Sequence, residues 1–420
     1  MSLLAYLVLT RIFSPEDFGL YNIFLSYIEV LVIISTCKYE LAIVVADNDN
    51  EALSLARFTL WLNAIVSLLL LVVTTCLVAF NAMPGKSEAL GWIALLVPVL
   101  VYFTGSSRVY SNICNRWHRY GQIALSETVN AVGAALAKVL FGLAGLLTVG
   151  MPLGTVLGKV AGNINYRIEL RRLRQHKSSP ACSNDNVLDN TTKKSMLAAA
   201  RQHARFPRYV ATKDFINSLS ANLPLLWLAL YFDKAEVGLF ALALTCTFRP
   251  VNLLNTAFEK VLYARVAEKV RARQCIRHDV WRFVAIVSAA ALLPMLAVWI
   301  FAEPLCSLLF GGRWSGCGFY VRCLLPWVFV ILSSSSLCFI SNVFGRQRTE
   351  FYFYMVLLAL RVAAMVAGLW TGSFKLAIAL FAASGALVAA ALLLWYLHQV
   401  NSYEKHAIAQ PPANHNGIKS

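Results

Sequence analysis

The sequence predicts an all-α polytopic membrane protein: about 12 transmembrane helices in two pseudo-symmetric six-helix bundles around a central cavity. Of its 420 residues, 59% are hydrophobic and only 14% are charged, and the mean hydropathy is +0.63. A soluble domain is typically about 45–50% apolar and about 25% charged. The apolar residues also come in long blocks, such as 60–80 and 376–397, and a membrane-spanning helix needs about 20 of them. These observations exclude a secreted disulfide scaffold, a nucleic-acid-binding domain and a soluble enzyme.

Apolar runs between polar segments predict where each helix lies. The expected helices cover residues 2–12, 19–37, 55–80, 90–110, 122–147, 150–169, 209–232, 237–259, 281–302, 319–342, 351–371 and 374–398. The first of them reaches only about 18 Å at about 1.5 Å per residue, which is too short to cross a bilayer. We therefore expect a missing upstream half-helix, with either a misassigned start codon or a fragmentary chain as its cause.

Basic residues predict how the helices are oriented. The chain carries 37 Lys and Arg against 21 Asp and Glu, a formal net charge of +16. Nine of the basic residues lie in the connection 170–208, which has only two acidic residues. Because Lys and Arg collect in cytoplasmic loops, we place this connection in the cytoplasm, and both termini then face the same side. The predicted domains are an N-terminal bundle (1–169), a basic cytoplasmic linker (170–208), a C-terminal bundle (209–400) and a disordered polar tail (401–420).

Two short motifs indicate an internal repeat. Gly19-Leu-Tyr21 and Gly238-Leu-Phe240 follow similar acidic turns, and an offset of 219 residues also superposes Glu40 on Glu259. Six helices separate the two copies, so both have the same orientation in the membrane. Duplicated bundles of this kind are typical of secondary transporters.

Several stretches resemble Wzx-type polysaccharide flippases. They are Thr10-Arg-Ile-Phe-Ser-Pro-Glu-Asp-Phe-Gly-Leu-Tyr21, Lys38-Tyr-Glu-Leu-Ala-Ile43, Phe206-Pro-Arg-Tyr209 and Leu309-Phe-Gly-Gly-Arg-Trp314. The resemblance implies the fold of the multidrug/oligosaccharidyl-lipid/polysaccharide exporter superfamily. It also implies a substrate, an undecaprenyl-pyrophosphate-linked oligosaccharide carried across the bacterial inner membrane for O-antigen, capsule or exopolysaccharide synthesis. The implied partners are membrane lipids, a polysaccharide polymerase and glycosyltransferases.

Charged residues near the middle of the predicted helices are the candidate binding residues. A charge at the centre of a membrane helix costs about 2.5–3.5 kcal/mol on insertion scales, so these side chains should face an aqueous space. A cationic cavity suits a pyrophosphate, and the candidate substrate-binding residues are Lys138, Lys159, Arg249 and Arg361. Two alternatives stay open: Arg249 pairs with Glu29 of the first repeat, and the two lysines extend to the membrane surface.

The sequence has no nucleotide-binding phosphate loop, so an ion gradient or removal of the product must drive transport. The candidate ion-coupling residues, for H⁺ or Na⁺, are Glu29, Glu40 and Glu259. No Cys/His cluster has the spacing of a metal site, and we expect no cofactor, no metal and no nucleic-acid partner.

Two other function classes fit the sequence less well than a flippase. A drug or metabolite cation antiporter would share the fold, but a net positive midplane suits a cationic substrate poorly. A membrane glycan polymerase or ligase would need a large outward loop with catalytic groups, and the longest outward loop expected here is only about 303–318. We therefore expect a transporter and not an enzyme.

Overall fold

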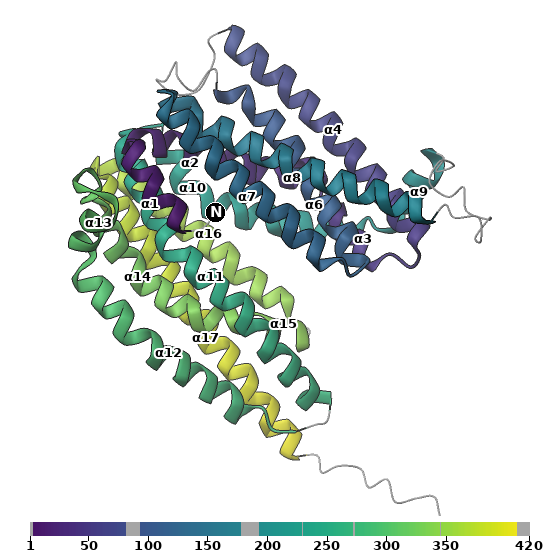
Figure 1. Ribbon diagram of the computed structural model, residues 1–420. Helices are drawn as coiled ribbons and strands as arrows, with labels where there is room; N and C mark the ends of the chain where they lie inside the picture. The colour runs from purple at the N-terminus through teal and green to yellow at the C-terminus, as the bar shows by residue number, and fades with distance from the viewer. Residues whose placement is uncertain are drawn as a thin grey trace, which may run out of the picture. The chain divides into compact units, whose positions relative to one another are not determined.

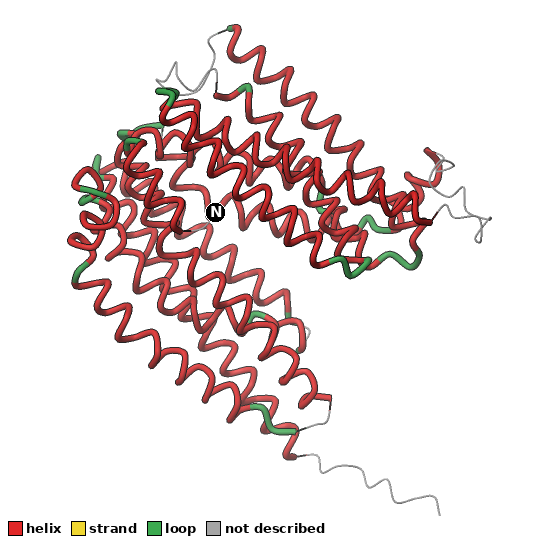
Figure 2. The backbone as a smooth tube through the Cα atoms, viewed as in Figure 1, coloured by secondary structure: helices red, strands yellow, loops and turns green. Residues whose placement is uncertain are grey.

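The computed structural model describes residues 3–80, 93–177, 193–228, 230–271, 274–344 and 346–409 (Figure 1). Within these ranges every regular element is a helix (Figure 2), which confirms the all-α prediction. The chain divides into two compact units, Met1–Gly238 (unit 1) and Leu239–Ser420 (unit 2). The domain boundaries predicted from the loop charges stay a prediction, and the division groups α10 with unit 1, where this helix packs against α2.

Unit 1 has a helix in each segment where one is predicted, and α3 and α9 lie outside those segments. They are α1 (Leu3–Ile12), α2 (Pro15–Thr36), α3 (Tyr39–Val45), α4 (Asp49–Ala79), α6 (Leu96–Arg116), α7 (Tyr120–Leu143), α8 (Leu147–Lys177), α9 (Lys193–Gln202), the π-helix η1 (Phe206–Ala211), α10 (Thr212–Leu228) and the first turn of α11 (Lys234–Arg271).

Helix α2 begins and ends at well-defined signals. Ser14 and Asp17 form a capping box, in which each side chain accepts a hydrogen bond from the other residue's backbone N–H. Pro15 at the first helical position reinforces this start. At the other end Cys37 and Lys38 both have positive φ angles, 47° and 59°. Two successive left-handed residues stop the helix close to its predicted end at residue 37. Helix α3 follows as a separate element, in a segment where the sequence analysis predicted no helix.

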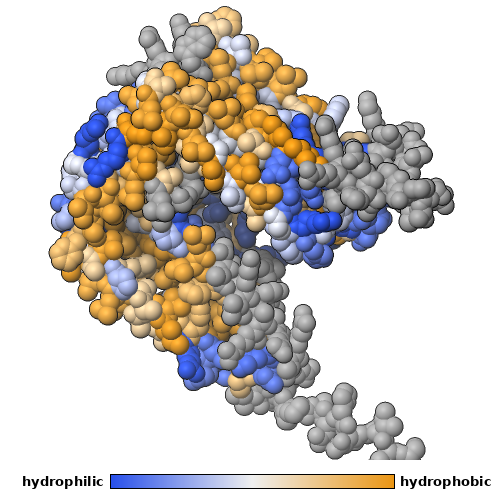
Figure 3. Space-filling view, in the orientation of Figure 1, coloured by the Kyte–Doolittle hydropathy of each residue, from blue (hydrophilic) through white to orange (hydrophobic). Residues whose placement is uncertain are grey.

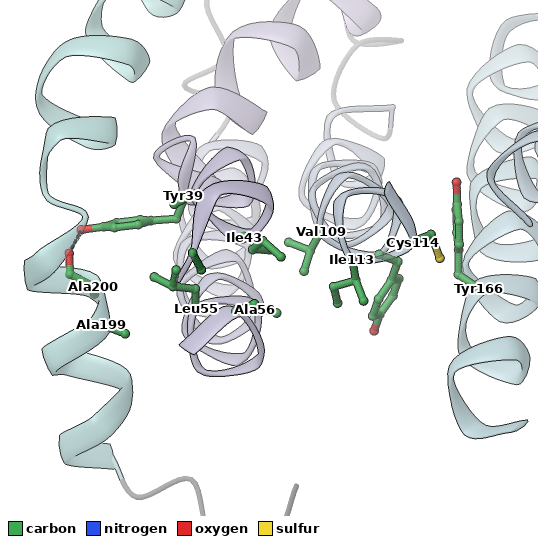
Figure 4. Packing of buried hydrophobic residues seen from close by; sticks show 14 residues of the cluster. Tyr39, Ile43, Leu55, Ala56, Val109, Ile113, Cys114, Tyr166, Ala199 and Ala200 are labelled. Atoms are coloured by element: carbon green, nitrogen blue, oxygen red, sulfur yellow. Dashed lines mark hydrogen bonds between the residues drawn. The ribbon is translucent and has the colours of Figure 1, made fainter. Parts of the chain in front are cut away.

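The core of unit 1 joins α3, α4, α6, α8 and α9 (Figure 4). Ile43, Leu55 and Val109 are fully buried in it, and the Tyr39 hydroxyl donates a hydrogen bond to the Ala200 carbonyl at 3.2 Å. This cluster fixes the rotation of α6 about its own axis.

Helices α7 and α8 pack closely because glycines recur at every fourth residue of α8. A Cβ atom at Gly154 would lie 2.6 Å from the Lys138 side chain, and one at Gly158 would lie 2.6 Å from the Asn130 carbonyl oxygen. Small residues at this spacing let two membrane helices approach closely. The stripe is Gly150, Gly154, Gly158 and Gly162.

The two glycines that the repeat superposes contact each other. A Cβ at Gly238 would lie 1.8 Å from the Pro15 carbonyl oxygen and 2.9 Å from the Gly19 nitrogen, and a Cβ at Gly19 would lie 2.2 Å from the Lys234 carbonyl oxygen. The start of α2 and the first turn of α11 therefore touch through their backbones, and neither position has room for a side chain.

Unit 2 contains the rest of α11 and the elements that follow it. They are α12 (Arg277–Ile300), α13 (Ala302–Phe310), η2 (Gly312–Trp314), α14 (Cys317–Ser334), η3 (Ser335–Leu337), α15 (Phe339–Val343), α16 (Gln347–Thr371) and α17 (Phe374–Ala409). Edge-to-face aromatic contacts link α11, α14 and α17: the Phe240 ring lies 6.0 Å from that of Tyr320 and 6.3 Å from that of Phe381. Such pairs add to the hydrophobic stabilisation.

Two segments outside the predicted bundles are partly helical. In the linker, α8 continues to Lys177 and α9 and η1 follow, whereas residues 178–192 lie outside the described residues. Helix α17 continues to Ala409, so the prediction of a disordered tail is wrong for residues 401–409. Tyr403 packs against the core of unit 2 and Glu404 lies 3.9 Å from Arg277, which explains why the helix continues.

Hydrophobic residues cover much of the visible surface, and hydrophilic ones gather mainly toward helix ends (Figure 3). Among the described residues, eight helices are long and apolar enough to cross a membrane, and α4 and α12 are the least buried of them. Helices α6 and α8 have 21 and 31 residues and are not among the eight; each carries a charged residue within its apolar part, Arg108 in α6 and Lys159 in α8. The polar faces of α6 and α8 must therefore be shielded from lipid.

Candidate functional site

Glu29 lies on the exposed face of α2 and has a partner within unit 1. The Asn222 side-chain amide of α10 donates a hydrogen bond to its carboxylate at 3.1 Å. Asn222 is buried, and it belongs to the segment after η1 that packs on α2. The alternative pairing of Glu29 with Arg249 stays a prediction.

Lys138 is enclosed in the packing of α7 against α2 and α8. Its side chain is 1% exposed, and its ammonium donates a hydrogen bond of 2.6 Å to the Tyr21 hydroxyl. Thr155 of α8 lies 2.9 Å from the same hydroxyl. Lys138 therefore contributes to a polar link between three helices, and its predicted role in substrate binding stays untested.

Lys159 of α8 is more accessible. Its side chain is 21% exposed and lies 4.0 Å from the carboxylate of Glu127, which is on α7 and 48% exposed. This loose ion pair leaves the ammonium able to bind another anion. Lys159 therefore has the exposure that the predicted binding role requires.

Glu40 of α3 is a buried carboxylate with one loose ionic contact. It is 2% exposed, and its Oε1 atom lies 4.0 Å from Nη1 of Arg108 on α6. In the part of the chain that the structure describes, neither Oε2 of Glu40 nor Nη1 of Arg108 has a hydrogen-bond partner. Its neighbour Lys38 instead pairs tightly with Asp214 at 2.7 Å.

The structure places the remaining predicted residues in different environments. Arg249 is exposed on α11 of unit 2, next to Pro250 inside the helix. Arg361 of α16 is 3% exposed, and its guanidinium lies over the rings of Phe381 at 4.6 Å and Trp327 at 5.1 Å. Glu259 is part of helix α11, and the structure does not describe the placement of its side chain.

One buried carboxylate was missed by the sequence analysis. Glu350 of α16 is 4% exposed and accepts hydrogen bonds from the hydroxyls of Ser341 and of Tyr396, the latter at 3.2 Å. Its position next to the basic Arg346 and Arg348 at a helix start made it look like part of a loop. No sequence signal indicated that Ser341 and Tyr396 would converge on it.

The cations thus fall into two groups. Lys138 and Arg361 are enclosed among helices of their own units, whereas Lys159, Arg108 and Arg249 are at least partly exposed. The exposed group can bind a phosphate by charge-assisted hydrogen bonds.

Residues 1–268 match the family described as polysaccharide biosynthesis protein. The chain belongs to this family. It is also 23% identical over 314 residues to the succinoglycan biosynthesis transport protein ExoT of Rhizobium meliloti (strain 1021). That alignment covers 73% of this chain but only 58% of the relative, so the chain spans little more than half of the relative's length.

Solved transporter structures share the fold. The lipid II flippase MurJ in an inward closed conformation matches with a TM-score of 0.71 at 9% identity, covering 97% of this chain and 88% of that one. An inward-facing multidrug resistance MATE family transporter of the MOP superfamily matches with a TM-score of 0.64 at 15% identity, covering 96% and 94%. This member of the polysaccharide biosynthesis protein family therefore has the same fold as these two transporters. The predicted fold class and family are confirmed.

Proposed function

We propose that the protein carries an undecaprenyl-pyrophosphate-linked oligosaccharide across the bacterial inner membrane by alternating access. The family match over residues 1–268 carries this proposal, and the shared fold of a lipid flippase supports it. The succinoglycan transport protein is similar over most of this chain, which favours an extracellular polysaccharide as the end product. The polymerase and glycosyltransferases that make such a polymer are the proposed partners.

In the proposed mechanism the exposed cations take the pyrophosphate while the lipid tail stays in the bilayer. Lys159 and Arg249 are the accessible members of the predicted set, and Lys138 and Arg361 contribute positive charge from within the helix packing. Glu29 and Glu40, with Glu259, are the proposed ion-coupling residues. The Asn222 amide donates a hydrogen bond to Glu29, and the Arg108 guanidinium lies 4.0 Å from Glu40.

Deletion of the encoding gene tests this function. We expect loss of the surface polysaccharide and accumulation of the undecaprenyl-linked repeat unit in the inner leaflet, measured by mass spectrometry of lipid extracts. A plasmid copy should restore both. The MATE-like fold also admits a drug or metabolite antiporter, in which case deletion would raise sensitivity to cationic compounds and leave the polysaccharide unchanged.

Arg249→Ala should abolish glycan export while the protein still accumulates in the membrane. Arg249→Lys should retain part of the export, since an ammonium attracts phosphate but lacks the bidentate geometry of the guanidinium. Export and protein level are measured together, with Arg313→Ala on the exposed η2 segment as control. Full recovery of export in the double variant Glu29→Ala/Arg249→Ala would instead support a pairing of these two residues.

The proposed orientation is tested by labelling single cysteines in a variant without the native ones. Gly121 lies in the first turn of α7 and Gly312 begins η2, and a Cβ atom at either meets nothing within 4 Å. With the linker in the cytoplasm, an impermeant maleimide should label Gly312→Cys on intact cells and Gly121→Cys only after permeabilisation. The reverse pattern would invert the proposed topology.

A further inference from the structure

We propose that Arg108 and Lys159 of unit 1 together form a receptor for the diphosphate of the transported lipid, and that Glu40 and Glu127 are counter-ions which the diphosphate displaces. This inference rests on the proposed function, because it assigns the headgroup of that substrate to two residues. Of these four residues, the sequence analysis named Lys159 as a candidate substrate-binding residue and Glu40 as a candidate ion-coupling residue, and it gave no role to Arg108 or Glu127.

A buried asparagine links the two helices that carry the cations, at the level of both. The Asn163 amide of α8 donates hydrogen bonds of 2.8 Å to the Ser107 hydroxyl of α6 and 2.8 Å to the Lys159 carbonyl. Ser107 precedes Arg108, so this contact fixes the height of Arg108 relative to Lys159. The Arg108 charge lies close enough to act on the Lys159 ammonium. Two cations on adjacent helices match the paired charges of a diphosphate.

Both cations have loose acidic partners. Arg108 lies 4.0 Å from Glu40 and Lys159 lies 4.0 Å from Glu127, beyond the 2.7–3.2 Å of a hydrogen bond. Elsewhere in unit 1 the pairs are tight, as in Lys38–Asp214 at 2.7 Å and Arg116–Asp49 at 2.9 Å. A competing anion therefore loses the least free energy when it displaces the carboxylates of the two long ion pairs, Glu40 and Glu127.

The buried ends of the Arg108–Glu40 pair leave hydrogen-bonding capacity unused. Nη1 of Arg108 and Oε2 of Glu40 are buried and have no hydrogen-bond partner among the described residues. A buried charge without good hydrogen bonds is costly, and a phosphate oxygen would supply the guanidinium with charge-assisted ones. The Arg108 side chain is 34% exposed, so a headgroup can reach it.

The site lies next to the close-packed core cluster of unit 1. Val109 and Cys114 of α6 are fully buried, and Tyr166 of α8 is 1% exposed, all in the core cluster of unit 1 (Figure 4). Because Val109 points into that core, the neighbouring Arg108 cannot turn into it. Preorganised cations of this kind lose little entropy when an anion binds.

Binding to the purified full-length protein tests the receptor directly, with farnesyl diphosphate, farnesyl monophosphate and inorganic pyrophosphate as probes. Farnesyl diphosphate should bind more tightly than the monophosphate, and inorganic pyrophosphate should compete with it. Arg108→Gln and Lys159→Gln should each weaken farnesyl diphosphate binding by about tenfold or more. Arg108→Lys should retain part of the affinity. Glu40→Gln should tighten binding by about threefold or more, because the competing carboxylate is gone.

Arg277→Gln is the matched control, because Arg277 also has a loose acidic partner, Glu404 at 3.9 Å, but is in unit 2. It should bind farnesyl diphosphate as the unsubstituted protein does. Melting temperature and gel filtration identify any variant that fails to fold. The receptor is refuted if folded Arg108→Gln and Lys159→Gln bind within about twofold of the unsubstituted protein, if Glu40→Gln weakens binding, or if the monophosphate binds equally well.

Glycan export by the same strains separates this inference from the proposed function. If export requires the protein but the substitutions leave diphosphate binding unchanged, the receptor is wrong and the proposed function stands. If deletion of the gene leaves export intact, the proposed function is wrong, whatever the protein binds.

Discussion

Gly238→Val should strongly reduce the amount of folded protein in the membrane. A Cβ atom at this position would lie 1.8 Å from the Pro15 carbonyl oxygen, so the backbones of α2 and α11 would have to separate. Overpacking usually costs about 1–3 kcal/mol, and we expect the upper end or more because a backbone atom, unlike a flexible side chain, cannot turn away. The measurements are the yield of monodisperse protein in detergent and its melting temperature.

Gly121→Val is the control for this prediction. Gly121 also lies in a helix, and a Cβ atom there meets nothing within 4 Å. We expect this variant to melt close to the unsubstituted protein. Equal melting temperatures for Gly238→Val and Gly121→Val would contradict the close approach of α2 and α11.

Arg361→Ala should lower the free energy of unfolding by about 2–5 kcal/mol, as for other long buried side chains cut back to alanine. The side chain is 3% exposed and its guanidinium stacks on Phe381 and Trp327. The substitution removes these contacts and leaves a cavity between α14, α16 and α17. Thermal unfolding followed by intrinsic fluorescence reports the change.

Arg361→Met separates volume from charge at the same site. Methionine fills much of the space and adapts to irregular packing, so we expect most of the melting temperature to be kept. A loss as large as that of Arg361→Ala would show that the charge, and not the volume, stabilises unit 2. Export by a stable Arg361→Met protein then tests the predicted role of this charge in substrate binding.

The helices could be predicted from the sequence because apolar runs of membrane length are seldom ambiguous. Each predicted segment contains a helix, including the short α1 at Leu3–Ile12. The short helix α3 (Tyr39–Val45) was not predicted, because its apolar run is far shorter than a membrane span. The positive φ angles of Cys37 and Lys38 that separate it from α2 could not be predicted either, since neither residue usually adopts them. The continuation of α17 to Ala409 depends on contacts of Tyr403 and Glu404 that only the folded unit provides.

The candidate site was predicted in its residue types but not in its pairings. Lys138, Lys159 and Arg361 were predicted because each is a charged residue near the middle of a predicted membrane helix. In the structure Lys138 and Arg361 are buried, whereas Lys159 is partly exposed. Which side chain meets which depends on the rotation of each helix, and that rotation is set by packing such as the glycine stripe of α8. The contact of Arg108 with Glu40 and the enclosure of Glu350 arise from the same source.

Helices α6 and α8 are less apolar than the helices that they pack on. Helix α6 packs on α4 and α8 packs on α7, and both of these partners are among the candidate membrane spans. The chain should therefore enter the bilayer as helical hairpins, with the polar helix of each pair held until its partner covers it. For α7 and α8 the closely spaced glycines allow that pairing. A bulky residue in the glycine stripe of α8 would therefore impair insertion of the protein into the membrane, and not only its transport activity.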